Sequence, residues 1–498
     1  MPQPQNHKRK PAPKTGKKPQ NAISKGAVAA CPYAKKCGGC QLQNMDYERQ
    51  LAFKQSRVVS LLGRYAHVEP ILGMDEPYHY RNKVQAAFGL TRSGKVVSGV
   101  YQAASHRIVN VDSCLTEDTV ADTIITDIRE MLPDFGIVPY NEDSRKGFLR
   151  HVLVKRGFAS GQVMVVLVGA TAAFPQKRKF CDALLKKHPE ITTVVFNQNA
   201  RDTSMLLGER EEVLYGDGYI EDTLCGCRFR ISAKSFYQIN PVQTEKLYGT
   251  AMKFAALKPT DTVLDAYCGV GTIGLVAAKQ AGQVIGVEVN PDAVRDARRN
   301  CRLNGAENAV FEQGDAGEWM TAVAAEGAKV DVVFMDPPRA GSDLPFLKAL
   351  CTLAPERVVY ISCNPETQAR DLRFLTTHGY KVKKIQPVDM FPHTNHIETV
   401  VLLSQQRPND KIRVELDLTE FDITAAEKEA TYQGIKDYIL EKHGVKVSSL
   451  YSAQVKEKLG IKERENYNKP KNADSKQPQC PKEKEKMIVE ALKHFKMI

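Results

Sequence analysis

The chain has 498 residues, of which 42% are hydrophobic, and it carries a formal net charge of +12. One hydrophobic core cannot organise a chain of this length, so we expect roughly two to four domains, and the positive charge favours a polyanionic partner. No stretch is long and apolar enough to span a membrane, and no apolar signal core opens the chain, which excludes a membrane protein and predicts a cytoplasmic one.

The first 28 residues form a basic tail. They contain seven lysine and arginine side chains and no acidic one. We predict that this segment is disordered, because it has too little apolar surface to order itself. It serves either as an arm that contacts phosphates or as a solubilising tail.

Four cysteines in the next part of the chain form a candidate metal site. Cys31, Cys37 and Cys40 lie within ten residues in the spacing C-x5-C-x2-C, and Cys114 is the next cysteine in the chain. Without an export signal, cysteines at this density indicate metal binding or catalysis rather than disulfides. Three clustered thiolates and one remote thiolate are typical of an iron–sulfur cluster. Structural zinc is the chemical alternative, although it usually has paired C-x2-C motifs.

Residues 116–230 have the pattern of a central α/β domain. Apolar and polar residues alternate in three segments bounded by turn residues, namely 147–156, 162–168 and 193–197. This alternation predicts strands of one sheet. Arg150 and Arg156, on the first of these strands, face either nucleic acid or solvent.

Residues 262–275 are expected to form a strand, a glycine loop and the start of a helix, with glycines in the pattern G-x-G-x-x-G. Such a loop lets the backbone approach a ligand at a helix N-terminus. The next strand ends at Glu288, where an acid would hold ribose hydroxyls, and Asp315 could bond an adenine amino group. NAD, flavin and S-adenosylmethionine would each fit. Asp265 ahead of the glycines favours S-adenosylmethionine, which has no pyrophosphate.

Two further strands end in motifs with reactive or polar side chains. Residues 330–341 end in Asp336-Pro-Pro-Arg, and the two prolines make a rigid loop that suits a group placed in advance. Residues 358–361 form a buried strand that stops at Ser-Cys363-Asn-Pro, where Pro365 stiffens the turn that holds the thiol. In a doubly wound sheet Asp336 and Cys363 would lie side by side.

A last apolar strand is predicted over residues 390–403. His396 and Glu398 are two positions apart in it, so they share a face if this segment is extended. A carboxylate on an apolar strand is costly unless it is paired or functional, and we interpret Glu398 as functional.

The order of these motifs resembles that of the RNA uracil-C5 methyltransferases, which act on 23S ribosomal RNA or on the T-loop of transfer RNA. The motifs are DAYCGVGTIGL, FMDPPRAG, YISCNPETQARDL and HTNHIETVVLL. The CPYAKKCGGCQ segment with Cys114 resembles the iron–sulfur members, which mostly act on ribosomal RNA. Many relatives carry an N-terminal β-barrel of the TRAM type that this sequence lacks, so RNA docking would fall to the basic tail or to a C-terminal segment.

The resemblance implies roles for individual residues. Cys363 would be the nucleophile that adds to C6 of uracil, and Glu398 the base that removes the C5 proton. The implied ligands of a [4Fe–4S] cluster are Cys31, Cys37, Cys40 and Cys114. The implied contacts to S-adenosylmethionine are Gln238, Tyr267, Thr272, Glu288, Asp315 and Asp336. Asp336 would also lie near the uracil, whereas Thr272 stands where some relatives have Asn.

We therefore predict an α/β protein with a Rossmann-like domain that methylates 23S rRNA at C5 of a uridine, and that is a monomer. Transfer RNA is the alternative substrate. An iron–sulfur redox sensor that binds RNA without methylating it, and a nicotinamide oxidoreductase, are alternatives from other classes.

The predicted segments follow from the same motifs. They are a basic tail at 1–28, an iron–sulfur segment at 29–115, a central α/β domain at 116–230, a methyltransferase domain at 231–404 and a helical extension at 405–498. Capping and stripe patterns predict three short helices in the extension. This part of the chain would be either a small nucleic-acid-binding module or a packing appendage.

Overall fold

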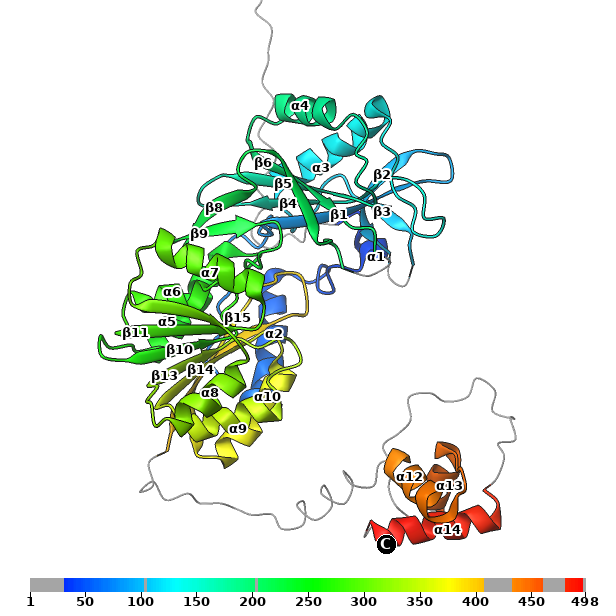
Figure 1. Cartoon of the computed structure of the whole chain (residues 1–498), viewed down its shortest axis with the longest axis vertical. Coiled ribbons are helices and arrows are strands. Elements are labelled where there is room, and N and C mark those ends of the chain that lie inside the picture. The colour runs from blue at the N-terminus through cyan, green and yellow to red at the C-terminus, as the bar shows by residue number, and fades with distance from the viewer. Residues whose placement is uncertain (1–30, 103–104, 202–204, 407–431, 460–479, 496–498) are drawn as a thin grey trace, which may run out of the picture. The chain divides into compact units, whose positions relative to one another are not determined.

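The computed structural model describes residues 31–102, 105–201, 205–406, 432–459 and 480–495 (Figure 1). The chain divides into two compact units, Met1–Arg407 and Pro408–Ile498. The predicted basic tail lies outside the described residues. The domain boundaries expected from the sequence stay predictions.

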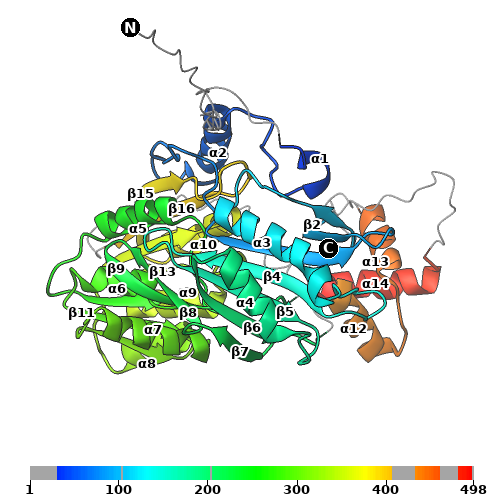
Figure 2. The ribbon, with the colours of Figure 1, turned by 90° about the horizontal axis from the view of Figure 1, so that it is seen from above.

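The first unit begins with a short helix, α1 (Ala34–Cys37), and a longer one, α2 (Tyr47–Leu62). The Asp46 side chain caps α2 by accepting a hydrogen bond from the Arg49 backbone N–H. Val58 and Leu62 of α2 are fully buried in the core of the second, C-terminal sheet of this unit. Figures 1 and 2 show α2 beside strand β15 (Tyr380–Val388) of that sheet. The sequence did not predict this helix or its packing.

The first sheet has seven strands in the order β3-β2-β1-β4-β5-β6-β7. All neighbours are antiparallel except β5 and β6. The strands are β1 (Lys83–Leu90), β2 (Val96–Tyr101), β3 (Ile108–Asn110), β4 (Leu149–Arg156), β5 (Val163–Gly169), β6 (Ile191–Gln198) and β7 (Arg210–Tyr215). The three strands expected from alternation, β4, β5 and β6, are present.

Both faces of this first sheet are covered. One face packs against α3 (Thr119–Met131), the short 3-10 helix η1 (Leu132–Phe135) and α4 (Lys177–Lys187). The other face packs against a hairpin of β8 (Tyr219–Leu224) and β9 (Cys227–Ser232). The hairpin also contributes to the core of the second sheet, so a single apolar cluster joins the two sheets.

The second sheet has the order β12-β11-β10-β13-β14-β16-β15, with β16 antiparallel to both of its neighbours. Besides β15, its strands are β10 (Thr262–Ala266), β11 (Gln283–Glu288), β12 (Ala309–Gln313), β13 (Val332–Met335), β14 (Arg357–Ser362) and β16 (Glu398–Gln405). The chain order reverses on either side of β10, which opens a crevice at the carboxyl ends of β10 and β13.

Helices cover both faces of the second sheet (Figure 1). One group is α5 (Pro241–Ala255), α6 (Thr272–Ala278) and α7 (Pro291–Leu303). The opposite group is α8 (Ala316–Ala325), α9 (Leu344–Leu353) and α10 (Pro365–Thr377), together with α2. The Asn240 side chain caps α5 by accepting from the Gln243 backbone N–H.

The last part of this sheet differs from the expectation. The sequence predicted one strand over 390–403, whereas β16 begins only at Glu398 and residues 389–397 form the loop between β15 and β16. His396 therefore does not share a strand face with Glu398. Pro392 and the polar residues 393–396 interrupt the apolar pattern, so the strand starts later than predicted.

The second unit contains α12 (Tyr432–His443), α13 (Ser449–Lys458) and α14 (Lys482–His494). Its small core includes Ile435, Ile439, Val455, Ile488 and Leu492. The capping pattern at the start of the first predicted helix, Thr424-x-x-Glu427, lies outside the described residues. Among the helices of the described ranges, none combines the length and apolar character needed to cross a membrane.

Candidate active site

Cys363 follows directly after β14, whose residues Val358 to Ile361 are fully buried. The turn behind it is held by Asn364, whose side chain accepts from the Glu366 backbone N–H and so caps α10, with Pro365 at the first helical position. The amide Nδ2 of Asn364 donates to the carbonyl oxygen of Arg339 at 3.1 Å. The thiol is half-buried at the carboxyl edge of the sheet.

Glu398 reaches the same edge from the antiparallel strand. Ser362 of β14 pairs with Thr399 of β16, so Cys363 and Glu398 are the next residues beyond that pair. The Thr399 hydroxyl donates to Gln368 Oε1 at 2.5 Å, and Gln368 Nε2 donates to the Tyr360 carbonyl oxygen at 3.1 Å. The residue Glu398 as a whole is only 5% exposed.

The acidic groups around Cys363 are shifted toward their protonated forms. Burial, followed by the Glu398 and Asp336 charges, raises the pKa of the Cys363 thiol to about 11. Burial and then the Asp336 charge raise the pKa of Glu398 well above its usual range. Desolvation by the surrounding walls raises the pKa of the half-buried Asp336 to about 7. Groups with strongly shifted pKa values in one crevice are typical of a catalytic site.

Arg339 is the cation of this cluster. Its charge lowers the pKa of the Cys363 thiol, and it also lowers the pKa of Glu398. We did not select Arg339 from the sequence. The signal available there was its position as the basic residue of the Asp-Pro-Pro-Arg loop, which lies beside the Cys363 turn in the sheet.

A cavity of about 1380 Å³ opens at the carboxyl ends of the parallel strands. All six residues predicted to contact S-adenosylmethionine line it: Gln238, Tyr267, Thr272, Glu288, Asp315 and Asp336. Cys363 and Glu398 do not line the cavity, but both interact electrostatically with Asp336. Asp336 therefore connects the cavity with the thiol site.

Backbone contacts hold two of the acids that line the cavity. Glu288 accepts through Oε2 from the Gly269 N–H at 3.1 Å and through Oε1 from the Asn290 N–H at 2.9 Å. Asp315 caps α8 by accepting through Oδ1 from the Gly317 and Glu318 N–H groups. Its Oδ2 makes neither of these bonds, so it can accept from a ligand amino group.

The aromatic and hydroxyl groups of the cavity are also held in place. Tyr267 has a left-handed backbone with φ of 64°, and its ring lies 4.9 Å from that of Phe346. The Thr272 hydroxyl is 3.0 Å from the hydroxyl of the buried Tyr248. A left-handed non-glycine residue at a ligand loop is a strained feature typical of binding sites.

The glycine loop packs so closely against neighbouring side chains at Gly271 that a Cβ atom would not fit there. A Cβ at Gly271, where φ is 82°, would lie 2.8 Å from the Phe311 ring. Beneath the loop, Asp265 Oδ2 accepts from the Gly274 N–H at 2.7 Å, and burial raises the pKa of this carboxyl to about 8. Its Oδ1 has no hydrogen-bond partner among the described residues. The acid-lined, glycine-floored cavity fits an adenosine with free ribose hydroxyls.

The four cysteines of the candidate metal site lie in one neighbourhood. Burial raises the pKa of Cys40 to about 12, and the Cys114, Cys37 and Cys31 charges act in the same direction. Backbone contacts tie Cys114 to α3, because its N–H donates to Asp122 Oδ2 at 2.7 Å. Within the described residues, no group of three or more Cys, His, Asp or Glu side chains is gathered closely enough to hold a metal ion. The four thiols therefore have the chemistry that an iron–sulfur cluster needs, but they are not gathered closely enough here to enclose one.

Comparison with known proteins places this site in a family. The family model for tRNA (uracil-5-)-methyltransferase matches residues 208–406. An RNA methyltransferase of Halalkalibacterium halodurans is 45% identical over 380 residues, which cover 75% of this chain and 83% of that protein. The chain belongs to the RNA uracil-5-methyltransferase family.

Other relatives of the family agree with this assignment. An RNA methyltransferase of Bacillus cereus is 43% identical over 382 residues, covering 76% of this chain and 83% of that protein. The solved structure of the Pyrococcus abyssi tRNA (uracil-54, C5)-methyltransferase, in complex with S-adenosyl-L-homocysteine, has a TM-score of 0.62 and 29% identity. It covers 73% of this chain and 85% of that one.

Membership of the uracil-5-methyltransferase family confirms several expectations. The protein is an S-adenosylmethionine-dependent RNA methyltransferase that acts on C5 of uracil, and its C-terminal sheet is the Rossmann-like methyltransferase fold. RNA is its substrate. A sensor that binds RNA without methylating it and a nicotinamide oxidoreductase do not agree with this family.

Proposed function

We propose that the protein methylates C5 of a specific uridine in 23S rRNA through a covalent bond between Cys363 and C6 of the base. The observation that carries the proposal is the meeting of Cys363 and Glu398 at the β14–β16 edge, next to Asp336 of the cavity wall. The choice of ribosomal RNA rests on the cysteine cluster, whose spacing resembles that of family members acting on this RNA.

Cys363 makes uracil C5 reactive. Its sulfur forms a bond to C6, and the electrons of the C5=C6 double bond move so that C5 becomes an enolate carbon. S-adenosylmethionine supplies the methyl group, which C5 takes as the methyl–sulfonium bond breaks. Arg339 supports the first step, because it favours the thiolate that must attack.

Glu398 completes the reaction as the base. It takes the proton from C5, the C5=C6 double bond forms again, and the bond between C6 and the Cys363 sulfur breaks. Burial raises the pKa of Glu398, so its carboxylate holds a proton more readily than an exposed one. The target uracil has to leave its stack to reach these two groups.

The cavity residues bind the methyl donor in this proposal. Glu288 accepts from the ribose hydroxyls, and Asp315 accepts from the adenine amino group. Gln238, Tyr267 and Thr272 line the remaining walls, and Asp336 lies between the donor and the uracil. Asp315 Oδ2 takes no part in the cap of α8, so it is available for the adenine contact.

We also propose that Cys31, Cys37, Cys40 and Cys114 are the ligands of a [4Fe–4S] cluster. Support comes from their spacing and from the electrostatic effect of three of the thiols on the fourth. The cluster would tie the N-terminal segment to the loop before α3. Zinc is the competing metal.

Transfer RNA is the second candidate substrate. One solved structure similar to this chain is that of a tRNA (uracil-54, C5)-methyltransferase, and the matching family model has the tRNA name. The methylated uridine lies in 23S rRNA in one case and in transfer RNA in the other, so identifying the RNA that carries the product distinguishes the two candidates.

The test is to map methyl groups by mass spectrometry after the protein, S-adenosylmethionine and unmodified total RNA have been incubated together. We expect 5-methyluridine at one position of 23S rRNA with the native protein and none with Cys363→Ala. 5-Methyluridine found in transfer RNA alone would refute 23S rRNA as the target, but it would still agree with the proposed reaction. Full activity of Cys363→Ala would refute the covalent mechanism.

Glu398→Gln separates the two halves of the reaction. Methyl transfer should still occur once per enzyme, whereas release should stall because no base takes the C5 proton. We expect a methylated enzyme–RNA adduct on a denaturing gel and kcat lowered by roughly a hundredfold or more. Turnover at the native rate would exclude Glu398 as the base.

The metal is tested by measuring iron, zinc and acid-labile sulfide in protein purified without oxygen. We expect four irons per chain, and their loss in Cys40→Ser. Cys351→Ser is the matched control, because this half-buried cysteine lies on α9 away from the candidate site. One zinc per chain without sulfide would replace the iron–sulfur proposal with the zinc alternative.

A further inference from the structure

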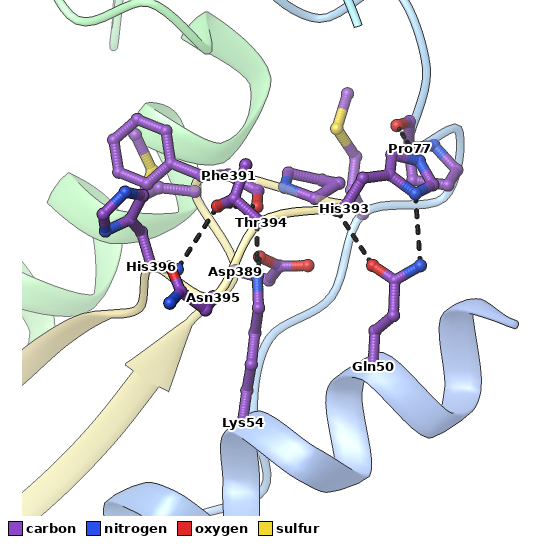
Figure 3. A network of polar contacts seen from close by, with 12 residues as sticks. Gln50, Lys54, Pro77, Asp389, Phe391, His393, Thr394, Asn395 and His396 are labelled. Carbon is purple, nitrogen blue, oxygen red and sulfur yellow. Dashed lines mark hydrogen bonds and ion pairs between the residues drawn. The ribbon is translucent and has the colours of Figure 1, made fainter. Parts of the chain in front are cut away.

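Helix α2 contacts the loop 389–397, which ends at Glu398 (Figure 3). We propose that α2 positions the carboxyl group of Glu398 for proton removal, with Lys54 and Gln50 as the positioning residues. This inference rests on the proposed role of Glu398 as the base. Neither residue touches the cavity or the thiol site, so each acts through the loop.

Lys54 makes the strongest contact between α2 and the loop. Its Nζ lies 2.6 Å from Asp389 Oδ1 in an ion pair whose two side chains are completely buried. The same Nζ donates to the Phe391 carbonyl oxygen at 3.0 Å. The Tyr47 hydroxyl donates to the other Asp389 oxygen at 2.9 Å. Because both charges have left water, the pair tolerates little change in geometry.

Gln50, one turn earlier on α2, holds the next part of the loop. Its Oε1 accepts from the His393 backbone N–H at 2.8 Å, and its Nε2 contacts His393 Nδ1 at 3.1 Å. The Pro77 carbonyl oxygen, 2.9 Å from His393 Nε2, can only accept, so Nε2 carries the proton and Nδ1 accepts from Gln50. His393 has a left-handed backbone with φ of 68°, a conformation that needs such support.

The loop is short and is attached to Glu398 at both ends. It leaves β15 after Val388, which pairs with Glu398, and it returns to the chain at Glu398 itself. Because both ends of this loop lie at Glu398, and Asp389, Phe391 and His393 are bonded to α2, a shift of the loop would also move Glu398. Leu42 adds a further contact, since its N–H donates to the His393 carbonyl oxygen.

The chemistry of the second half-reaction makes this positioning measurable. Proton removal needs the carboxyl within hydrogen-bond reach of C5, so a small displacement slows release more than methyl transfer. Lys54→Met and Gln50→Leu should therefore accumulate the methylated enzyme–RNA adduct. We expect kcat to fall roughly ten- to a hundredfold, with KM for S-adenosylmethionine changed little.

Arg357→Met is the matched control. Arg357 forms a largely buried ion pair of 2.7 Å with Asp261, and it starts β14, the strand whose other end carries Cys363. Its loss should lower stability as an ion-pair deletion does, without displacing the loop 389–397. Gln50→Leu leaves no unpaired charge, so it keeps the test valid if Lys54→Met does not fold.

The experiment follows adduct formation, methyl content and kcat for the three variants and Glu398→Gln under single-turnover and steady-state conditions. Adduct in Lys54→Met or Gln50→Leu and none in Arg357→Met supports the positioning role. Adduct in Glu398→Gln alone overturns that role and leaves the proposed function intact. Native turnover of Glu398→Gln refutes the base and this inference together.

Discussion

At the scale of single residues, the surroundings of Cys363 favour its neutral thiol over the thiolate. The Cys363 thiol has a pKa of about 11, because burial and two neighbouring carboxyl groups disfavour the thiolate. Arg339 opposes them from the Asp-Pro-Pro-Arg loop. The balance resembles other thiol sites in which one cation decides how much thiolate is present.

Arg339→Gln should move the pH dependence of covalent capture to higher pH. Without the guanidinium the pKa of Cys363 rises further, so less thiolate is present at any pH below it, and capture near neutral pH should slow about tenfold per pKa unit. The measurement is the rate of adduct formation with RNA carrying 5-fluorouridine, which has no C5 proton to release. Arg373→Gln, an exposed position on α10, is the control. An unchanged profile would contradict the role of Arg339.

At the scale of elements, a strand, a turn and a helix present the thiol together. The turn after β14 is fastened to α10 by the Asn364 cap and to the neighbouring loop by the Asn364 amide. The antiparallel return of β16 then adds Glu398 at the same edge. Asn364 makes both contacts, so its effect on stability, through the cap, can be separated from its effect on catalysis, through the contact to the Arg339 carbonyl.

Two substitutions at Asn364 separate these contributions. Asn364→Ala loses both the cap and the contact to Arg339, and it should lower the free energy of unfolding by about 1 kcal/mol. Asn364→Ser keeps a capping hydroxyl, so most of that stability should return, whereas kcat should remain low in both variants. Denaturant unfolding and steady-state kinetics check this. Restored kcat in Asn364→Ser would mean that the contact to the Arg339 carbonyl does not matter.

At the scale of the whole molecule, the first unit contains several carboxyl groups whose pKa is raised by desolvation. Asp265 has a pKa of about 8, Asp336 about 7, and the pKa of Glu398 is also raised. A folded-state pKa above the unfolded value means that the folded chain binds more protons in between. These groups therefore stabilise the fold below about pH 4, and that stability is lost as pH rises toward 8.

Asp265→Asn should flatten this dependence. The amide oxygen can still accept from the Gly274 N–H, but it cannot ionise, so the fall in Tm between about pH 5 and pH 8 should shrink by a few degrees. Thermal unfolding of the protein without added ligand gives the measurement. Asp331→Asn is the control, because the pKa of this partly exposed carboxyl is lowered. Equal slopes for native protein and Asp265→Asn would refute the shifted pKa.

Local signals in the sequence were enough for the Rossmann-like sheet, its glycine loop and most of the candidate side chains. Each parallel strand, turn and helix start is encoded within about ten neighbouring residues, and the carboxyl ends of such strands meet at one edge. Asp336 and Cys363 could therefore be placed side by side in advance. The cysteine ligands were predicted from their spacing and the individual roles from motif resemblance, and both remain predictions.

The tertiary structure alone decided which distant residues meet. Lys54 and Asp389 are 335 positions apart, and no pattern along the sequence predicts that they form an ion pair. The start of β16 at Glu398, the added strand β15 and the effect of the Arg339 charge on the thiol also depend on neighbours that the sequence does not specify. A pattern of apolar residues determines which face of an element is buried, whereas the partner on that face is selected by packing of the whole chain.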